Sequence, residues 1–220
     1  MQEEVRELKE HLEEKKIRGL ALDIDETLAA TSQHWFALLF EKLGNPERRS
    51  AKEMAEKYTV VENVPYWNAL PEFQTWHKQA VSSEALHADV PLVAYAKETV
   101  DAMKEEIPFV AYITGRPENL RQVTHAWLQH HGFDELPLIM KPPTCKEKSN
   151  NEWKAEILHE LYPYVTGIVD DNPGLSTYLA DDYAGTVFVL GKKQTEDARE
   201  NIIACEDWQE VYKTLQHIQG

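Results

Sequence analysis

The chain has 220 residues with 23 basic and 38 acidic side chains, which gives a formal net charge of −15. This length suits one globular domain with an insertion, and a hydrophobic content of 42% is enough to build a core. Such an acidic protein is a poor candidate for binding nucleic acid, which favours basic surfaces, and no apolar run is long enough to span a membrane. The two cysteines, Cys145 and Cys205, lack metal-site spacing, so we expect a cytoplasmic protein with ordinary thiols.

Residues 1–16 are expected to form a charged helix ahead of the main domain. Val5, Leu8 and Leu12 follow one another at helical spacing and form a narrow apolar stripe. The stripe can pack one edge of the helix on the domain, or it can bind a partner. The segment is too charged to be the apolar region of a secretory signal.

Five short apolar runs follow, and each is typical of a strand that is covered on both faces. They are Gly19–Ile24, Pro108–Ile113, Leu136–Met140, Thr166–Val169 and Thr186–Leu190. Amphipathic helices are expected between the later runs, beginning at Pro117, at the capping box of Ser149 and at Asn172-Pro173. This alternation predicts an α/β fold with a doubly wound, Rossmann-like parallel sheet of about five core strands.

The gap between the first two runs is too long for a simple connection. About 80 residues separate Ile24 from Pro108, whereas a crossover between parallel strands requires a single helix. We therefore expect a helical cap over residues 29–89, inserted into a core of residues 17–28 and 90–220. The cap is rich in aromatic residues, which we interpret mainly as its own small core, with ligand contact as the alternative. His34, His77 and His87 are interpreted as surface or packing residues.

Polar side chains follow three of the runs at the point where each strand ends. They are Asp23 and Asp25, then Thr114, Gly115 and Arg116, and finally Asp170 and Asp171. The carboxyl ends of parallel strands meet at one edge of the sheet, so these groups should lie together. Four crowded aspartates repel one another unless a cation compensates. Because carboxylate oxygens suit Mg²⁺, the pattern predicts a magnesium site.

These motifs resemble those of the haloacid dehalogenase-like superfamily of phosphohydrolases, and they occur in the same order. They are Asp23-Ile24-Asp25-Glu26-Thr27-Leu28, Ile113-Thr114-Gly115-Arg116, Lys154 and Val169-Asp170-Asp171. The matching segments span about 150 residues. They are specific for the superfamily but not for one of its members. The resemblance implies a phosphatase with a helical cap and with Mg²⁺ as its cofactor.

The resemblance also implies the role of each catalytic residue. Asp23 would be the nucleophile that forms an aspartyl-phosphate, and Asp25 would serve as general acid and base. Thr114 would hold phosphoryl oxygens. Lys154 would neutralise charge, although Lys141 is an alternative for this lysine.

Further residues are implied in binding. Thr27, Gly115 and Arg116 would contact the substrate, and Arg116 could instead pair with Glu118. The Mg²⁺ ligands would be Asp23, Asp25 through its carbonyl, Asp170 and Asp171, with Asp171 the more direct of the last two.

Asp25 favours a phosphatase over a dehalogenase, because a leaving alkoxide requires an acid and a leaving halide does not. We therefore expect a Mg²⁺-dependent phosphomonoester hydrolase that acts on a small molecule such as a nucleotide or a sugar phosphate. A polynucleotide-end phosphatase and a non-catalytic regulatory module of the same fold remain as alternatives.

Overall fold

The computed structural model describes residues 2–219 and contains one parallel sheet. Its strands are β1 (Gly19–Leu22), β2 (Phe109–Pro117), β3 (Leu138–Lys141), β4 (Val165–Asp170), β5 (Thr186–Leu190) and β6 (Ile202–Cys205). The strand order is β3-β2-β1-β4-β5-β6, and every neighbouring pair is parallel. The predicted doubly wound α/β fold is therefore confirmed. Within residues 2–219, no helix is long and apolar enough to cross a membrane.

Strand β6 was not predicted, and the sheet has six strands rather than about five. It pairs only with β5, so it lies at the edge of the sheet, and Ile203 and Ala204 are only partly buried. Its four residues, Ile202-Ile203-Ala204-Cys205, are all apolar, so the pattern that marks the covered strands was present here and the sequence analysis overlooked it.

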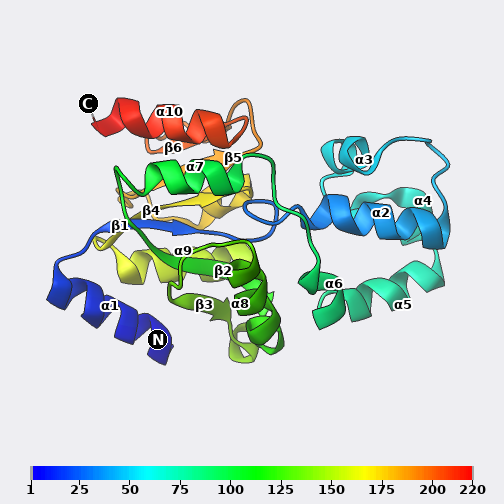
Figure 1. The fold of residues 1–220 in the computed structure, drawn as a ribbon, viewed down its shortest axis with the longest axis horizontal. Helices are drawn as coiled ribbons and strands as arrows, with labels where there is room; N and C mark the ends of the chain where they lie inside the picture. Colours follow the sequence, from blue (N-terminus) through cyan, green and yellow to red (C-terminus); the bar gives the residue numbers. More distant parts are fainter. Residues whose placement is uncertain (1, 220) are drawn as a thin grey trace.

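Helices cover both faces of the sheet (Figure 1). One face is covered by α7 (Ala96–Met103), α8 (Arg121–His130) and α10 (Trp208–Gln219), and the other by α1 (Glu3–Lys15) and α9 (Asn150–Leu161). Successive strand residues point to opposite faces, so Leu20 and Leu22 pack in one core cluster and Ala21 in the other. Strand β1 is therefore buried on both faces, by the helices that cover the two sides of the sheet.

Helix α1 packs on the sheet layer through its apolar stripe. Val5, Leu8 and Leu12 are buried in the same cluster as Trp153 of α9, and Lys9 forms a 2.8 Å ion pair with Glu160. The stripe is thus covered within this chain and is not free to bind a partner.

The helix expected at Asn172-Pro173 is instead a 3₁₀ helix, η4 (Pro173–Tyr178). The Leu175 N–H donates to the Asn172 carbonyl at 3.1 Å and the Leu179 N–H to the Ser176 carbonyl at 3.3 Å, which is the backbone spacing of a 3₁₀ turn. Glycine, serine and threonine in this segment favour the α-helix only weakly. The Asn172 side chain caps the turn by accepting from the Gly174 N–H at 3.0 Å.

A second lobe lies between β1 and α7 along the chain, and we call it the cap lobe; the rest is the core lobe. It consists of α2 (Thr31–Leu43), α3 (Ala51–Tyr58), η1 (Val61–Asn63), α4 (Pro65–Asn68), α5 (Pro71–Ala80) and α6 (Glu84–Ala88). These helices share their own core around Phe36, Trp67 and Phe73. Most of the cap aromatics therefore stabilise the lobe itself.

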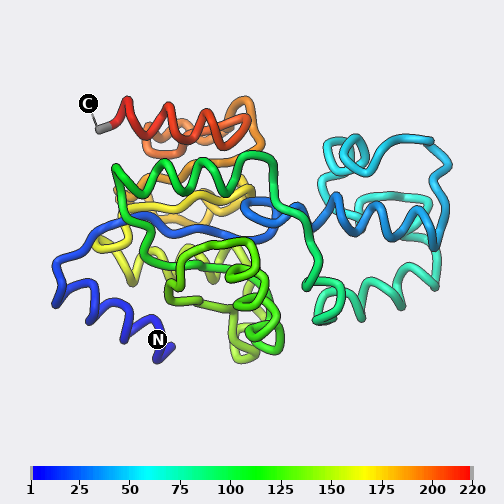
Figure 2. The backbone as a smooth tube through the Cα atoms, viewed as in Figure 1, coloured from blue at the N-terminus to red at the C-terminus, as the bar shows by residue number. Residues whose placement is uncertain are grey.

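The chain crosses between the lobes twice, and the crossing segments lie side by side (Figure 2). The Ala30 N–H donates to the Pro91 carbonyl and the Val93 N–H donates to the Leu28 carbonyl, both at 2.8 Å. Helix α6 also packs on α8, and Trp127 Nε1 donates to the Val90 carbonyl at 2.7 Å. The two lobes are thus joined by a short paired connection directly after β1.

Candidate active site

A cavity of about 330 Å³ lies between the carboxyl edge of the sheet and the cap lobe. This volume is at the low end of the range for small-molecule sites. From the core lobe it is lined by residues that include Asp23, Asp25, Thr114, Gly115, Arg116, Lys154 and Asp171. The sequence motifs from three separate strand ends therefore meet in one cavity.

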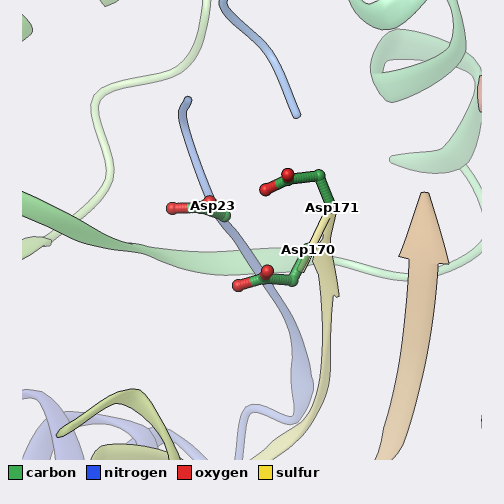
Figure 3. Close-up of side chains that lie close together, drawn as sticks. All are labelled: Asp23, Asp170 and Asp171. Atoms are coloured by element: carbon green, nitrogen blue, oxygen red, sulfur yellow. The ribbon is translucent and has the colours of Figure 1, made fainter. Parts of the chain in front are cut away.

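Three carboxylates form a cluster at the ends of two neighbouring strands. Asp23 follows β1, Asp170 ends β4 and Asp171 comes next, and one oxygen of each lies within 4.8 Å of the others. Figure 3 shows all three carboxyl groups pointing the same way. Burial, together with the charges of its neighbours, raises the pKa of Asp171 well above its usual value. The three carboxylates therefore repel one another, and a bound cation would reduce this repulsion.

Lys154 lies beside this cluster and pairs with two of its members. Its Nζ is 2.9 Å from Asp23 Oδ2 and 2.6 Å from Asp170 Oδ2, and its side chain is 5% exposed. Burial alone would lower the pKa of Lys154, but the two carboxylates outweigh burial and raise it. Lys154 is therefore a permanent cation next to Asp23.

Lys141, the alternative, points elsewhere. Its Nζ donates to the Lys148 carbonyl and to Asn150 Oδ1, and it does not line the cavity.

The position of Lys154 follows from where α9 begins. Ser149 caps this helix, because its Oγ accepts from the Glu152 N–H at 3.0 Å. Lys154 then lies on the first turns of α9, above the end of β4.

Asp23 keeps one oxygen without a protein partner. Its side chain is 6% exposed, and Oδ1 accepts no hydrogen bond from residues 2–219, whereas Oδ2 pairs with Lys154. Burial raises the pKa of Asp23 to about 7, with the charges of Asp170 and Asp25 acting in the same direction and Lys154 against them. An orphaned, buried carboxylate oxygen in a three-carboxylate cluster fits a hard divalent cation.

Asp25 is held by a bidentate contact with Arg116. Arg116 Nε donates to Oδ2 at 2.9 Å and Nη2 to Oδ1 at 2.7 Å, and the Thr31 hydroxyl also donates to Oδ1 at 2.5 Å. Burial acts to raise the pKa of Asp25, but the Arg116 guanidinium outweighs it, and the pKa falls to about 2. Asp25 is thus ionised in this arrangement.

The predicted alternative that Arg116 pairs with Glu118 is wrong, because Glu118 pairs with Arg121. The side chain of Arg116 is 1% exposed, and Nη1 donates to Thr124 Oγ1 at 3.2 Å. Its positive charge is paired with the carboxylate of Asp25. Arg116 lines the cavity as the group that positions Asp25.

The comparisons with known proteins concern the fold. No protein-family model and no curated protein sequence matches the chain, but solved structures do. YfnB of Bacillus subtilis, a putative hydrolase solved with magnesium, is 13% identical, with 91% of this chain and 99% of YfnB covered at a TM-score of 0.54. A Deinococcus radiodurans hydrolase with bound phosphate and sodium is 17% identical, with 92% and 96% covered at a TM-score of 0.52.

This chain has the haloacid dehalogenase-like fold. The resemblance that the motifs indicate is therefore confirmed at the level of the fold. A dehalogenase solved with an intermediate complex is similar as well, at 12% identity, 90% and 96% coverage and a TM-score of 0.55. The haloacid dehalogenase-like fold is thus shared by neighbours of different chemistry, and the site must decide between them.

Thr114 and Gly115 lie near the end of β2 and line the cavity. Thr114 is fully buried, and its Oγ1 accepts from the Arg116 N–H at 3.3 Å. A Cβ on Gly115 would lie 2.4 Å from Nδ2 of Asn150. A larger residue at this position would therefore displace the Asn150 side chain at the start of α9.

Thr27 does not reach the cavity, so its predicted contact with substrate is not seen. It is fully buried and absent from the cavity lining, and its carbonyl accepts from Trp208 Nε1 at 2.8 Å. The reason is a tight turn after Asp25, in which Glu26 has a φ of +57°. This turn directs Thr27 into the core.

Glu26 is a cavity residue that the sequence analysis did not assign. Its carboxylate accepts from the Ser32 N–H at the start of α2, and burial raises the pKa of Glu26 to about 7. Helix α2 has no side-chain cap of its own, so Glu26 fills that place from the core lobe. The turn after β1 thereby holds the first cap helix.

The cap lobe adds side chains that the sequence analysis missed. Trp35, Glu62, His77 and His87 line the cavity. His77 is also stacked on Phe73 and His87 contacts Trp35 edge-on, which agrees with their interpretation as packing residues. His34 is not part of the lining. These residues come from separate cap segments without metal-ligand spacing, and no local signal in the sequence brings them together.

Proposed function

We propose that this chain is a Mg²⁺-dependent phosphomonoester hydrolase that acts on a small molecule through an aspartyl-phosphate on Asp23. The observation that carries the proposal is the state of Asp23, which lines the cavity with one oxygen unpartnered and the other paired with Lys154. A carboxylate nucleophile requires such an oxygen and a fixed orientation. Asp25 lies in the same cavity as a candidate for proton transfer.

Asp23, Asp170 and Asp171 would hold the magnesium ion, with the Asp25 carbonyl as a further ligand by resemblance to the superfamily. Asp171 is the better direct ligand of the acidic pair, because it lines the cavity, whereas Asp170 is occupied by Lys154 and the Asn172 N–H. The bound ion would offset the negative charge of the phosphate beside the carboxylates.

In the first half of the reaction, Oδ1 of Asp23 attacks phosphorus and the bond to the leaving oxygen breaks. Lys154 holds Oδ2 of Asp23 and keeps the nucleophile oriented. The leaving oxygen takes a proton from Asp25. Because the carboxylate is ionised while it is paired with Arg116, Asp25 must first part from Arg116 and take up that proton from solvent. The Arg116 contact therefore marks a resting arrangement of the acid.

In the second half, Asp25 acts as a base and takes a proton from water. The resulting hydroxide attacks the phosphorus of the aspartyl-phosphate, the bond to Asp23 breaks, and inorganic phosphate leaves. The ionised state of Asp25 beside Arg116 already suits this step. Asp23 returns as a carboxylate.

The alternatives fit the site less well. A dehalogenase expels halide and requires neither an acid nor a cation site, so it leaves Asp25 and the carboxylate cluster without a role. A polynucleotide end is disfavoured by the small acidic cavity and the net charge of −15. A non-catalytic module would not require an unpartnered nucleophile beside a buried lysine.

The proposal is tested by hydrolysis of p-nitrophenyl phosphate with Mg²⁺ and with EDTA, for the wild type and for Asp23→Asn. We expect turnover only with the metal, and a loss of at least about 10⁴-fold in kcat for the variant. The near-isosteric change should leave the circular dichroism spectrum intact. Metal-independent turnover, an active Asp23→Asn variant, or chloride release from a 2-chloroacid without phosphatase activity would contradict the proposal.

We also propose a cytoplasmic location. Cys145 and Cys205 are both free thiols, and Cys205 is buried against α10 in the core. Free thiols are typical of a reducing compartment. Fractionation of cells that express a tagged chain tests this part of the proposal.

A further inference from the structure

The first turns of α9 place a second polar side chain beside Lys154. Asn150 begins this helix and Lys154 follows four residues later, so their side chains lie on the same helix face, one turn apart. On this face Lys154 Nζ lies 2.9 Å from Oδ2 of Asp23. Both residues line the cavity, but Lys154 is buried and Asn150 is exposed. Asn150 therefore lies nearer to solvent than Lys154, where an entering ligand can reach it.

The amide group of Asn150 lies against Gly115. A Cβ on that glycine would be 2.4 Å from Asn150 Nδ2 and 2.6 Å from Asn150 Cγ. Gly115 and its neighbour Thr114 line the same cavity. The amide is thus placed where the end of β2 meets the start of α9, beside the cavity that contains Asp23.

Lys141 determines which atom of this amide faces Gly115. Its Nζ donates to Asn150 Oδ1 at 3.2 Å and also to the Lys148 carbonyl. Because an ammonium group can only donate, the amide atom that it meets is the oxygen, and the NH₂ group lies on the side of Gly115. The structure shows no hydrogen bond from Nδ2 to another of residues 2–219, whereas Asn151 Nδ2 donates to Asn172 Oδ1 at 3.1 Å. Asn150 therefore presents an exposed, oriented donor beside the cavity.

We propose that Asn150 binds the substrate by donating from Nδ2 to a phosphoryl oxygen, and that Lys141 is the positioning residue that orients its amide. The role of Asn150 rests on the proposed phosphatase function and adds a residue to the same site. A donor to an ionised phosphate makes a stronger hydrogen bond than a donor to a neutral group. Lys141 acts through Asn150 and does not touch the substrate.

Inorganic phosphate is the probe, because it carries the phosphoryl oxygens without a leaving group. Calorimetry with Mg²⁺ measures its binding without turnover, and inhibition of p-nitrophenyl phosphate hydrolysis measures it a second time. Asn150→Ala should weaken phosphate binding by about tenfold, as expected for the loss of a hydrogen bond to a charged group. The matched control is Asn151→Ala, whose lost Nδ2 already has a partner in Asn172. It should weaken binding by less than about threefold, and equal losses in the two variants would overturn the proposal.

Asn150→Asp separates a donor from a structural side chain. The aspartate has nearly the same shape and can still accept from Lys141, but it turns a second acceptor oxygen toward Gly115 in place of the NH₂ group. Phosphate should therefore bind more weakly to Asn150→Asp than to Asn150→Ala. Wild-type affinity in Asn150→Asp would show that the side chain only packs α9 on β2, and it would overturn the proposal.

The positioning role of Lys141 is tested by a double-mutant cycle. Lys141→Met should weaken phosphate binding by about threefold in the wild type, because the Asn150 amide is then free to turn. The same change in Asn150→Ala should have an effect of less than about 1.5-fold, because no amide is left to orient. Equal effects in the two backgrounds would show that Lys141 acts independently of Asn150, and they would overturn its positioning role.

The proposed function and the role of Asn150 fail in different ways. A wild type that neither hydrolyses p-nitrophenyl phosphate nor binds phosphate contradicts the proposed function, and the role of Asn150 with it. A wild type that does both, together with unchanged phosphate affinity in Asn150→Ala, overturns the role of Asn150 alone. Circular dichroism spectra of the variants check that each is folded.

Discussion

The core lobe and the cap lobe place their charged groups in opposite environments. In the core, Lys154 is 5% exposed between Asp23 and Asp170. In the cap, Glu47 pairs with Lys57 at 2.7 Å and accepts hydrogen bonds from Tyr58 and Tyr66 at the surface of the lobe. Burying charge is costly even when it is paired, whereas exposed pairs contribute little. The core lobe thus buries a charged cluster beside the cavity, whereas the Glu47 cluster of the cap lobe lies at the surface of that lobe.

The two environments meet at the connection after β1. Asp25 accepts a hydrogen bond from Thr31 of the first cap helix, and Glu26 accepts from Ser32 one residue later. The candidate acid of the core is therefore positioned partly by the cap. Variants in the core, at the junction and in the cap should differ in both the size and the kind of their effect.

The largest effect is expected for Lys154→Ala. Two buried aspartates then lose their common cation, which should lower the free energy of unfolding by about 3–5 kcal/mol and kcat by about 100-fold or more. Urea unfolding in EDTA and hydrolysis of p-nitrophenyl phosphate with Mg²⁺ measure the two effects.

Lys141→Ala is the control for this variant, because Lys141 bonds only to the Lys148 carbonyl and Asn150 near the surface. Its unfolding free energy should change by less than about 1 kcal/mol. A larger kinetic loss in Lys141→Ala than in Lys154→Ala would reverse the assignment of the lysine.

The next effect concerns the metal. At 100 times its Kd, Mg²⁺ should stabilise the wild type by about 2.7 kcal/mol, or about 5–10 °C in Tm. Asp171→Asn should lose this shift and should be more stable than the wild type in EDTA, because it removes a buried repulsion. Differential scanning fluorimetry with Mg²⁺ and with EDTA measures both. A full Mg²⁺ shift in Asp171→Asn would exclude Asp171 as a ligand.

A smaller effect is expected at the junction. Thr31→Val removes the hydroxyl that bonds Asp25 and should lower kcat by about tenfold, with little change in Tm. Thr75→Val, whose hydroxyl bonds only its own helix backbone in the cap, is the matched control. If the two variants have the same kcat, Asp25 is positioned by Arg116 alone.

The smallest effect is expected in the cap, and it depends on pH. Hydrogen bonds from Lys57 and Tyr58 lower the pKa of Glu47 to about 2 from an ordinary value near 4.5. A depressed carboxylate pKa stabilises the fold above the ordinary value, and this contribution is lost as the pH falls toward 2. Glu47→Gln should therefore have a lower Tm than the wild type at pH 7, and the difference should vanish near pH 2.

Thermal unfolding followed by circular dichroism at pH 7, 4 and 2.5 measures this prediction. Glu56→Gln, in an exposed 3.9 Å pair with Lys52, should match the wild type at every pH. Hydrolysis of p-nitrophenyl phosphate at pH 7 should be unchanged in Glu47→Gln. A Tm difference that is constant with pH would show that Glu47 contributes through packing and not through its charge.

Local patterns in the sequence were enough to predict the five covered strands, the inserted cap and the residues at the strand ends. These features depend on neighbours along the chain, since an apolar run of four to six residues marks a covered strand wherever it occurs. Because parallel strands end at one edge, the meeting of Asp23, Thr114 and Asp170 followed from the strand pattern alone. Strand β6 was overlooked although Ile202-Ile203-Ala204-Cys205 is an apolar run of four residues, the shortest length that marks a covered strand.

Tertiary structure alone decided which distant side chains meet. It selected Lys154 over Lys141, gave Arg116 to Asp25 instead of Glu118, and buried Thr27 beneath a turn. It also brought Trp35, Glu62 and His87 from three cap segments into the lining of the cavity that contains Asp23 and Asp171. Contacts of this kind depend on how helices pack and where the chain turns, and residue spacing does not encode them. The sequence therefore indicated which residues end the strands, whereas only the folded cap lobe completed the lining of the cavity.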